Sequence, residues 1–283
     1  MFTDFTEELN SNFVQQIQNL NQFKSLDFYY IIEAYGNVMG GYQNFYDAWI
    51  YENNESWCVG FWIDGNYLLN SKELDVNDLH KINEKINFKF FDQDGFHFAG
   101  DTKLIDNLTE LNKGKFELDS FKERYFYVSN KINFESELQN NISLLNICDI
   151  DKVATLYQQY YVEEYEGKNN KELEFVKANI NYLMSKKLIY KLELENDIIG
   201  FCTKMSFLSQ KPNMIGTIFI EESKRNNKFA QNLLAEVSNE MLRQNQEIYL
   251  MTTKKNTASN KMVENVGFIK QYDHSDRIIK NYA

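Results

Sequence analysis

The sequence predicts a mixed α/β (α+β) protein built from two mixed-sheet domains. The chain has 283 residues, a length that suits one large domain or two of ordinary size. Apolar residues make up 43% of the chain and aromatic residues 15%, which is enough to fill well-formed cores. Short apolar runs with strand character alternate with segments of helical periodicity along the chain. Together these observations exclude disordered, collagen-like and loop-dominated classes.

The net charge and the positions of the cysteines and histidines limit which ligands and disulfides are expected. The formal net charge is −11, which does not suit nucleic-acid binding because phosphate neutralisation needs a basic surface. Cys58, Cys148 and Cys202 are far apart, so we expect reduced thiols rather than disulfides. The three histidines are equally scattered, and no metal site is expected.

The N-terminal residues 1–8 are acidic and polar, unlike a signal peptide, which starts with basic residues and continues with an apolar core. No stretch reaches the roughly 18 apolar residues of a membrane-spanning helix. We therefore expect a cytoplasmic protein without membrane contacts. The sequence leaves the oligomeric state open.

The first half is expected to alternate helices and strands without a chemical motif. Phe13, Ile17 and Leu20 recur at helical spacing. The pair Asp64-Gly65 is a turn signal between two apolar runs, which predicts a hairpin. In chain order we expect a helix around 13–20, strands at 47–51, 57–63 and 67–69, a helix at 75–86, a strand at 96–98, a helix at 103–111 and a strand at 125–128.

The polar, asparagine-rich segment 130–141 is the expected boundary. It gives a first domain of residues 1–134 and a second of residues 141–283, and the alternative is one domain that continues through the segment. In the second half, Gly267 ends the last predicted helix. There we expect strand 142–147, a helix from 149, helix 172–184, strands 188–194 and 198–204 around a turn at 195–197, strand 215–220, helix 229–243, strand 248–252 and helix 257–266.

The segment 215–230 is a strand, a polar loop and a helix start. Such a loop directs main-chain N–H groups and the positive end of a helix dipole at an anion. Lys224, Arg225 and Lys228 add positive charge to an otherwise acidic chain. The alternative interpretation is an ordinary solvated loop between a strand and a helix.

A second segment, 256–268, has capping signals at both ends, with Asn256 as the N-cap and Gly267 as a left-handed residue after the helix. In this order and spacing the two segments resemble the GNAT superfamily of N-acyltransferases. The first corresponds to the family signature Arg/Gln-x-x-Gly-x-Gly/Ala. The second fits the family helix Asn-x-x-Ser-Asn-x-x-Tyr-x-x-x-Gly-Phe through Asn256, Ser259, Asn260, Gly267 and Phe268.

The resemblance implies a central, mostly antiparallel sheet flanked by helices in the second domain. It also implies that acyl-CoA lies in a V-shaped opening between strands 215–220 and 248–252. Strand residues would pair with the pantetheine arm, loop amides would hold the pyrophosphate, and the second helix would contact the pantetheine or its phosphate side. The implied cofactor residues are Ile218, Phe219, Ile220, Arg225, Asn226, Asn227, Lys228, Phe229, Ala230, Asn256 and Ser259. The first domain resembles the diverged GNAT-like domain of a family subgroup, and its lack of either signature implies that it does not bind CoA.

The activity that the resemblance implies is transfer of an acetyl group from acetyl-CoA, as cosubstrate, to an amine by direct attack. The acceptor would be a small molecule or a peptide. The main-chain amide of Ile220 would polarise the thioester carbonyl, and a base must take a proton from the substrate ammonium. Glu222 is the candidate base, and the other candidates are the carboxylates of Glu163, Glu164 and Glu193. For each of them the alternative is a solvated surface carboxylate.

Three positions depart from the family pattern. Lys228 and Asn226 stand where the family has glycines, and Val263 stands where it has the tyrosine that protonates the departing thiolate. These departures keep two other classes open. One is a non-catalytic acyl-CoA-binding or regulatory module, and the other is an interaction protein in which neither half binds CoA.

Overall fold

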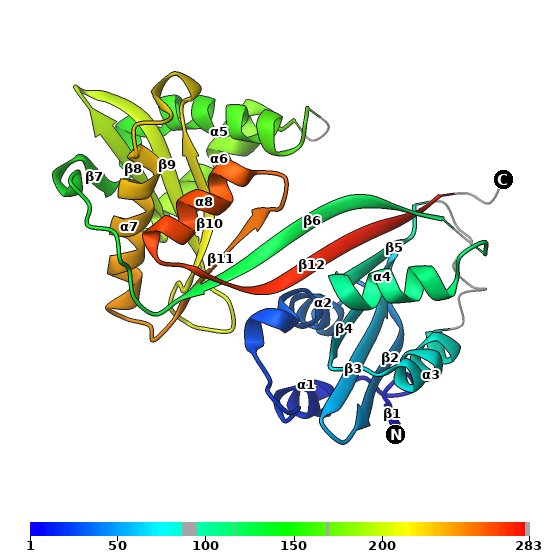
Figure 1. Ribbon diagram of the computed structural model, residues 1–283. Coiled ribbons are helices and arrows are strands. Elements are labelled where there is room, and N and C mark those ends of the chain that lie inside the picture. Colours follow the sequence, from blue (N-terminus) through cyan, green and yellow to red (C-terminus); the bar gives the residue numbers. More distant parts are fainter. Residues whose placement is uncertain (87–94, 116, 168–169, 281–283) are drawn as a thin grey trace. The chain divides into compact units, whose positions relative to one another are not determined.

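The computed structural model describes residues 1–86, 95–115, 117–167 and 170–280. The chain has two compact units (Figure 1). Unit 1 comprises Met1–Phe126, Thr253–Lys255 and the chain from Gln271 onward, and unit 2 comprises Tyr127–Thr252 and Asn256–Lys270. The mixed α/β class is confirmed. The division into domains 1–134 and 141–283 stays a prediction, since compactness does not show which segments fold independently.

The two halves of the chain have the same order of elements. Among the described residues, and leaving short 3₁₀ turns aside, each half runs strand, helix, helix, three strands, helix, strand, helix, strand. In the first half these are β1(Phe2–Asp4), α1(Ser11–Gln18), α2(Tyr29–Met39), β2(Phe45–Asn53), β3(Ser56–Ile63), β4(Asn66–Lys72), α3(Val76–Ile86), β5(His97–Asp101), α4(Thr102–Leu111) and β6(Glu117–Ser129). In the second half they are β7(Ile142–Leu144), α5(Ile150–Glu164), α6(Leu173–Ser185), β8(Ile189–Leu194), β9(Asp197–Met205), β10(Met214–Ile220), α7(Phe229–Leu242), β11(Ile248–Thr253), α8(Thr257–Val266) and β12(Ile269–Lys280).

Unit 1 contains a mixed sheet with the strand order β1-β2-β3-β4-β5-β12-β6. The first four strands are antiparallel to one another, and β4 and β5 are parallel. The expected hairpin between β3 and β4 is confirmed, and Gly65 in its turn has a φ of +69°. The last strand of the chain, β12, lies beside β5 in antiparallel register, with Ser275 opposite Gly100.

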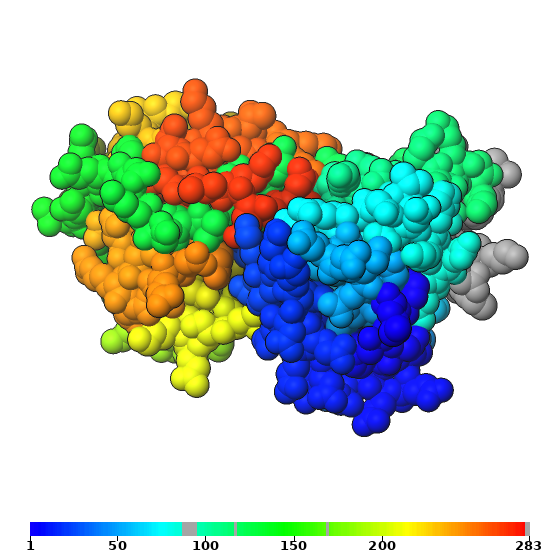
Figure 2. All heavy atoms as spheres, turned by 60° about the horizontal axis from the view of Figure 1, so that its bottom comes forward, coloured from blue at the N-terminus to red at the C-terminus, as the bar shows by residue number. Residues whose placement is uncertain are grey.

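Side chains alternate between the two faces of the unit 1 sheet, as the period of two of a strand requires. Ala48 and Ile50 of β2 pack with Phe13, Ile17 and other residues of the α1 and α2 side. Trp49 and Tyr51, which alternate with them along the strand, pack with the α3 and α4 side. Helices therefore cover both faces, and Figure 2 shows the blue atoms of the first 40 residues at the surface of this unit.

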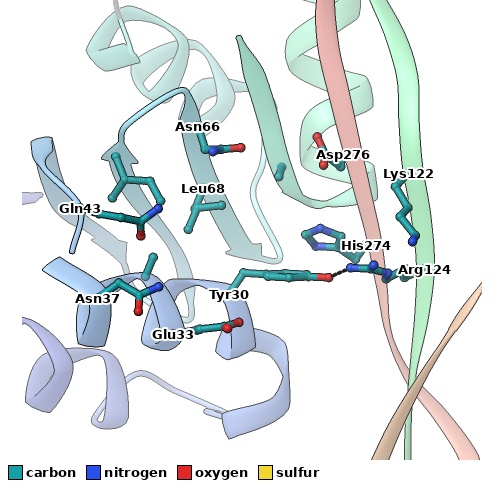
Figure 3. A pocket seen from close by; sticks show the side chains of 13 residues that line it. Tyr30, Glu33, Asn37, Gln43, Asn66, Leu68, Lys122, Arg124, His274 and Asp276 are labelled. Atoms are coloured by element: carbon teal, nitrogen blue, oxygen red, sulfur yellow. Dashed lines mark hydrogen bonds between the residues drawn. The ribbon is translucent and has the colours of Figure 1, made fainter. Parts of the chain in front are cut away.

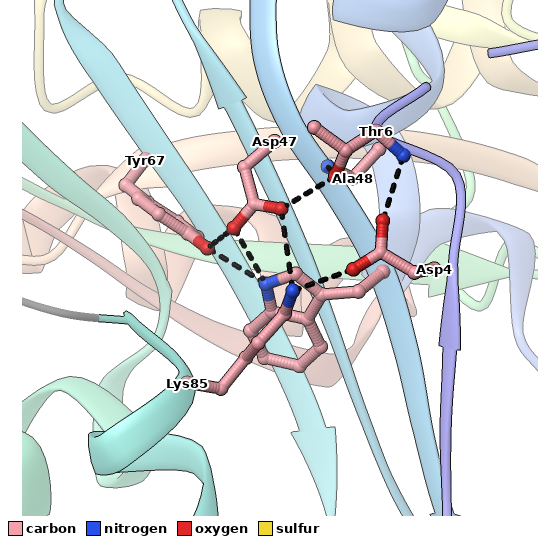
Figure 4. Close-up of polar contacts among 7 residues, drawn as sticks. Asp4, Thr6, Asp47, Ala48, Tyr67 and Lys85 are labelled. Atoms are coloured by element: carbon pink, nitrogen blue, oxygen red, sulfur yellow. Dashed lines mark hydrogen bonds and ion pairs between the residues drawn. The ribbon is translucent and has the colours of Figure 1, made fainter. Parts of the chain in front are cut away.

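A polar cluster fixes the first strand of unit 1 (Figure 4). The Asp47 carboxylate accepts hydrogen bonds from the Tyr67 hydroxyl at 2.7 Å and from the Thr6 hydroxyl at 2.8 Å. Lys85 of α3 bridges Asp4 at 2.6 Å and Asp47 at 3.6 Å. Each of these polar groups therefore has a partner, and the cluster serves to position β1.

Unit 2 has the strand order β11-β10-β9-β8-β7, with the last residues of β6 next to β11. Strands β7 to β10 are antiparallel and β10 and β11 are parallel. One face packs on α5 and α6 through a core that contains Val153, Ile180 and Phe201. The other face carries α7, whose Leu234 and Val237 are fully buried. The expected sheet flanked by helices is confirmed.

Three elements were not expected from the sequence. The strand β1 has only three residues. Helix α2 begins with the apolar run Tyr29-Tyr30-Ile31-Ile32, which hides its helical period. Strand β12 is largely polar, yet Tyr272, His274 and Ile279 are buried in unit 1. Among the described residues, none of the helices has both the length and the apolar character needed to cross a membrane.

Candidate functional site

The internal strand β10 has an irregular pairing with β9. Ile215 lies opposite Lys204 and Ile218 opposite Cys202, so Gly216 and Thr217 share Thr203 as their partner. This is a β-bulge, which bends a strand and re-aims its main chain. The Thr217 N–H donates to the Thr203 hydroxyl at 2.8 Å rather than to a main-chain carbonyl.

Strand β10 parts from its other neighbour, β11. Within the described parts of the chain, their parallel register consists of Met214 opposite Tyr249, at the start of both strands. Beyond this point Gly216 is exposed and Thr217 and Ile218 are only half-buried, although the strand is internal to the sheet. The edge of β10 that faces β11 is therefore open from Gly216 onward.

The main-chain amide of Ile220 points to this open edge. In antiparallel pairs the N–H groups of successive residues point to opposite sides of the strand. The Glu221 N–H donates to the Ile199 carbonyl of the β9 side at 2.8 Å. Because Ile220 is adjacent to Glu221, its N–H faces the other way, toward β11. Ile218 has the same parity, so the alternation of the strand directs its main-chain groups to the same edge.

The loop that follows β10 holds two non-glycine residues in the left-handed region. The φ angle is +67° at Asn226 and +58° at Lys228. These are the two positions where the family pattern has glycine, and glycine is the residue that adopts such angles without cost. The main chain therefore has the path of a glycine loop with other side chains on it.

Helix α7 begins directly after this loop with Lys228 as its N-cap, and no side chain caps it. The first N–H groups of an α-helix have no partner within the helix, and the helix dipole makes that end positive. Phe229, Ala230 and Gln231 supply these groups here. An anion of phosphate character fits this position.

The positive side chains of the loop are not equivalent. Arg225 donates to both oxygens of Glu163 on α5, at 2.8 and 2.9 Å, and its Nε donates to the Ile220 carbonyl at 2.9 Å. Its guanidinium also lies over the Phe219 ring, 5.2 Å from the centroid. Arg225 thus ties the loop to α5 and β10, while Lys224 and Lys228 are exposed.

The second motif forms α8 as expected. The Asn256 side chain accepts a hydrogen bond from the Ser259 N–H at 3.0 Å, and Gly267 follows the helix with a φ of +117°. The predicted N-cap and C-terminal glycine are confirmed. Val263, at the position of the family tyrosine, is only 1% exposed and carries no proton to donate.

Two tyrosines of α5, which sequence reasoning did not single out, reach the bulge of β10. The hydroxyls of Tyr157 and Tyr160 both interact with the Thr217 side chain, and that of Tyr157 also interacts with Asn179. Burial raises the pKa of both phenols, so both are protonated near neutral pH. Tyr157 is buried and Tyr160 half-buried. The sequence could have indicated them, because two tyrosines three residues apart lie on the same side of a helix.

The four carboxylates proposed as bases have different surroundings. Glu163 is held by Arg225, and Glu193 is bonded to Lys191 at 2.5 Å. Glu164 lies near the Tyr160 hydroxyl. Glu222 is exposed at the start of the short 3₁₀ turn Glu222–Lys224. In the described part of the chain there is no group of three or more His, Cys, Asp or Glu side chains able to hold a metal ion.

The strands of unit 1 that correspond to β10 and β11 by element order are β4 and β5, and they do not part. Their parallel register runs from Asn66 opposite His97 to Leu69 opposite Gly100. A Cβ at Gly100 would lie 1.7 Å from the Leu69 carbonyl oxygen, which shows how closely the two strands approach. The opening seen beside β10 therefore has no counterpart between β4 and β5.

Comparison with known proteins agrees with this geometry. Residues 202–278 match the family described as FR47-like protein, which is related to GNAT proteins. A search of curated proteins gave no match. The chain is similar in structure to an acetyltransferase of the GNAT family from Colwellia psychrerythraea, with a TM-score of 0.57, 11% identity, and coverage of 99% of this chain and 100% of that one.

Two other solved structures are similar. A Drosophila protein aligns with a TM-score of 0.58 and 10% identity over 99% of both chains. A GCN5-related N-acetyltransferase from Sphaerobacter thermophilus aligns with a TM-score of 0.53 and 10% identity over 80% of this chain and 76% of that one. At such low identity these likenesses show the fold, and the resemblance to the GNAT superfamily is confirmed at that level.

Proposed function

We propose that this GNAT-fold chain is an N-acetyltransferase whose unit 2 binds acetyl-CoA and transfers the acetyl group to an amine. The observation that carries the proposal is the open edge of β10. A strand that parts from its parallel neighbour leaves the main-chain groups of Ile218 and the N–H of Ile220 available for an extended, amide-containing chain such as pantetheine. The loop and the start of α7, directly after that edge, suit the pyrophosphate.

Each residue at this edge, loop and helix start has a proposed role in binding or catalysis. Main-chain groups of Ile218 pair with pantetheine, whereas those of Phe219 face β9 by the alternation of the strand. The Ile220 amide polarises the thioester carbonyl. Amides of the loop and the first turn of α7 hold the pyrophosphate, and Asn256 and Ser259 lie at the start of α8 for contacts to the pantetheine side. The amides concerned belong to Arg225, Asn226, Asn227, Lys228, Phe229 and Ala230.

The reaction is direct attack of a neutral amine on the thioester carbonyl. The amine nitrogen bonds to the carbonyl carbon and loses a proton, the C–S bond breaks, and the thiolate takes up a proton. Val263 does not donate that proton, and the Tyr160 hydroxyl, which interacts with Thr217 of β10, is the candidate donor. Glu222, exposed beyond the end of β10, stays the candidate base.

Calorimetry with acetyl-CoA tests the binding step. Because Arg225 is tied to Glu163, the informative variant is the double substitution Lys224→Ala with Lys228→Ala, which removes the two exposed cations of the loop. It should weaken binding by about tenfold at low salt and less at high salt, since exposed charges are screened. Lys186→Ala with Lys211→Ala, two exposed lysines elsewhere in unit 2, is the matched control. Equal affinity of both double variants at both salt concentrations would reject the phosphate assignment.

The second candidate function is a non-catalytic acyl-CoA-binding or regulatory module, which the buried Val263 favours. Release of free thiol from acetyl-CoA in the presence of a panel of amines separates the two. An enzyme releases thiol in proportion to the acetylated amine formed. A binding module retains acetyl-CoA without turnover on every amine of the panel.

A further inference from the structure

Unit 1 contains a cavity of about 210 Å³ between α2 and one face of its sheet, lined by apolar, amide and charged residues. Tyr30, Glu33, Ala34 and Asn37 line it from α2 and are spaced as one face of a helix requires. The opposing wall is a row across three strands, in which Leu68 lies opposite Ala99 and Ala99 opposite Asp276. The cavity is therefore built by regular elements and not by a loose loop.

Charges of both signs line this cavity from different walls. Lys122 and Arg124 are two residues apart on β6 and so project from the same side of that strand. Glu33 comes from α2 and Asp276 from β12. Figure 3 shows Lys122 and Arg124 on the side of the cavity opposite Asn37 and Gln43. The four charged side chains sum to a net charge of zero when all are ionised.

Neighbouring aromatic side chains position the guanidinium of Arg124. Arg124 donates a hydrogen bond to the Tyr30 hydroxyl, and its guanidinium lies 5.9 Å from the centre of the Tyr30 ring. The Tyr30 ring in turn lies 4.5 Å from the His274 ring, centre to centre. A guanidinium held in this way is preorganised to bind a carboxylate with its planar set of donors.

One residue that lines the cavity, His274, has a buried nitrogen without a hydrogen-bond partner among the described residues. His274 is 4% exposed, and its Nδ1 has no hydrogen-bond partner among the described residues. Burial, with the charges of Arg124 and Lys254, lowers the pKa of His274 to about 3, so the imidazole is neutral at physiological pH. Buried polar atoms are normally paired, so this unpaired nitrogen is an unusual feature of the residues that line the cavity.

We propose that this cavity binds a small zwitterionic metabolite of amino-acid size, with its carboxylate at Arg124 and Lys122 and its ammonium at Glu33. A lining without net charge accepts a ligand without net charge at the lowest electrostatic cost, and Glu33 on α2 with the two cations on β6 orients it. The volume is below the roughly 300–1,000 Å³ of pockets for drug-sized ligands, so the ligand is small. The side-chain amides of Asn37, Gln43 and Asn66 provide further donors and acceptors. The site lies within unit 1 and does not depend on CoA binding to unit 2.

Calorimetry of the full chain with the standard amino acids, β-alanine and γ-aminobutyrate tests this assignment. At least one of these zwitterions should bind at one site per chain, and more tightly than propionate or propylamine, which each carry only one of the two charges. Glu33→Gln and Lys122→Gln should each weaken that binding by about tenfold or more. The matched controls are Glu110→Gln on α4 and Lys113→Gln just after it, both highly exposed, and they should leave it unchanged.

Hydrogen exchange provides a second measurement that needs no variant. The bound zwitterion should slow exchange of main-chain amides in α2 and in the part of β6 that contains Lys122 and Arg124. Three results would overturn the proposal. They are the absence of binding by any zwitterion at millimolar concentration, equally tight binding of propionate or propylamine, or binding that neither Glu33→Gln nor Lys122→Gln changes.

Discussion

Asn226 and Lys228 have left-handed conformations at the two positions where the family pattern has glycine. Both have positive φ angles, which cost an ordinary residue about 1–2 kcal/mol and glycine nothing. Asn tolerates this region better than Lys does. The conformation is therefore set by the surrounding strand and helix rather than by the loop residues. The sequence alone shows two missing glycines, and the structure shows that the main-chain path is nevertheless present.

Lys228→Gly should therefore be tolerated or stabilising. Relief of the left-handed strain, about 1–2 kcal/mol, is offset by about 0.5–1 kcal/mol from the greater freedom of glycine in the unfolded chain. The thermal midpoint, followed by circular dichroism, should stay the same or rise by a few degrees. Glu236→Gly in the middle of α7 is the control, and it should lower the midpoint because glycine inside a helix costs about 1 kcal/mol. Destabilisation by Lys228→Gly as large as that of the control would contradict the strain argument.

Arg225 shows how packing can give a loop side chain a partner that the local sequence does not indicate. Sequence spacing groups it with Lys224 and Lys228 as a phosphate-binding charge. In the folded chain its guanidinium holds both oxygens of Glu163, 62 residues away. A pairing at that sequence distance is set by the packing of α5 against β10, which local sequence does not encode.

Strand β10 is the element on which the proposed function depends. Its range and type were predicted from its apolar run. The helices that pack on the two faces of the unit 2 sheet were predicted from periodicity and caps. The bulge at Gly216 and Thr217 and the separation from β11 were not predictable from the residues themselves, because both are relations between strands. The resemblance to the GNAT superfamily alone implied the opening. The roles of individual residues at this opening stay predictions.

Helix α5 supplies the tyrosines that face the bulge, and Tyr160→Phe tests their part in the reaction. Tyr160 is preferred to Tyr157 because Tyr157 is buried whereas Tyr160 is half-buried. If Tyr160 protonates the leaving thiolate, its loss should lower the rate of acetyl transfer by about 100-fold or more and leave acetyl-CoA affinity unchanged. Tyr182→Phe on α6, where the side chain is 59% exposed, is the control and should have no effect. A wild-type rate in Tyr160→Phe would exclude it as the acid.

The described residues use one order of elements twice, as the resemblance of the first domain to a diverged GNAT-like domain implied. Self-similarity between the halves is too low to see in the residues, whereas the order of strands and helices repeats from β1 to β6 and from β7 to β12. The predicted elements include most of each repeat. The strand missed at the end, β12, has a polar sequence, and its burial depends on pairing with β5, more than 160 residues earlier in the chain.

The position of β12 leads to a prediction about truncation. Ending the chain after Lys270 removes the part of β12 that belongs to unit 1, with the buried residues Tyr272, His274, Ser275 and Ile279. Strand β5 then loses its antiparallel partner and exposes main-chain groups. Although the deletion is at the C-terminal end of the sequence, the damage should fall on the N-terminal half. Limited proteolysis with mass spectrometry should find new cleavage sites mainly before Phe126, with unit 2 still protected by acetyl-CoA.

A chain that ends after Lys280 is the control and should be cut like the full chain. New cleavage mainly between Tyr127 and Lys270 would show instead that unit 2 depends on this strand.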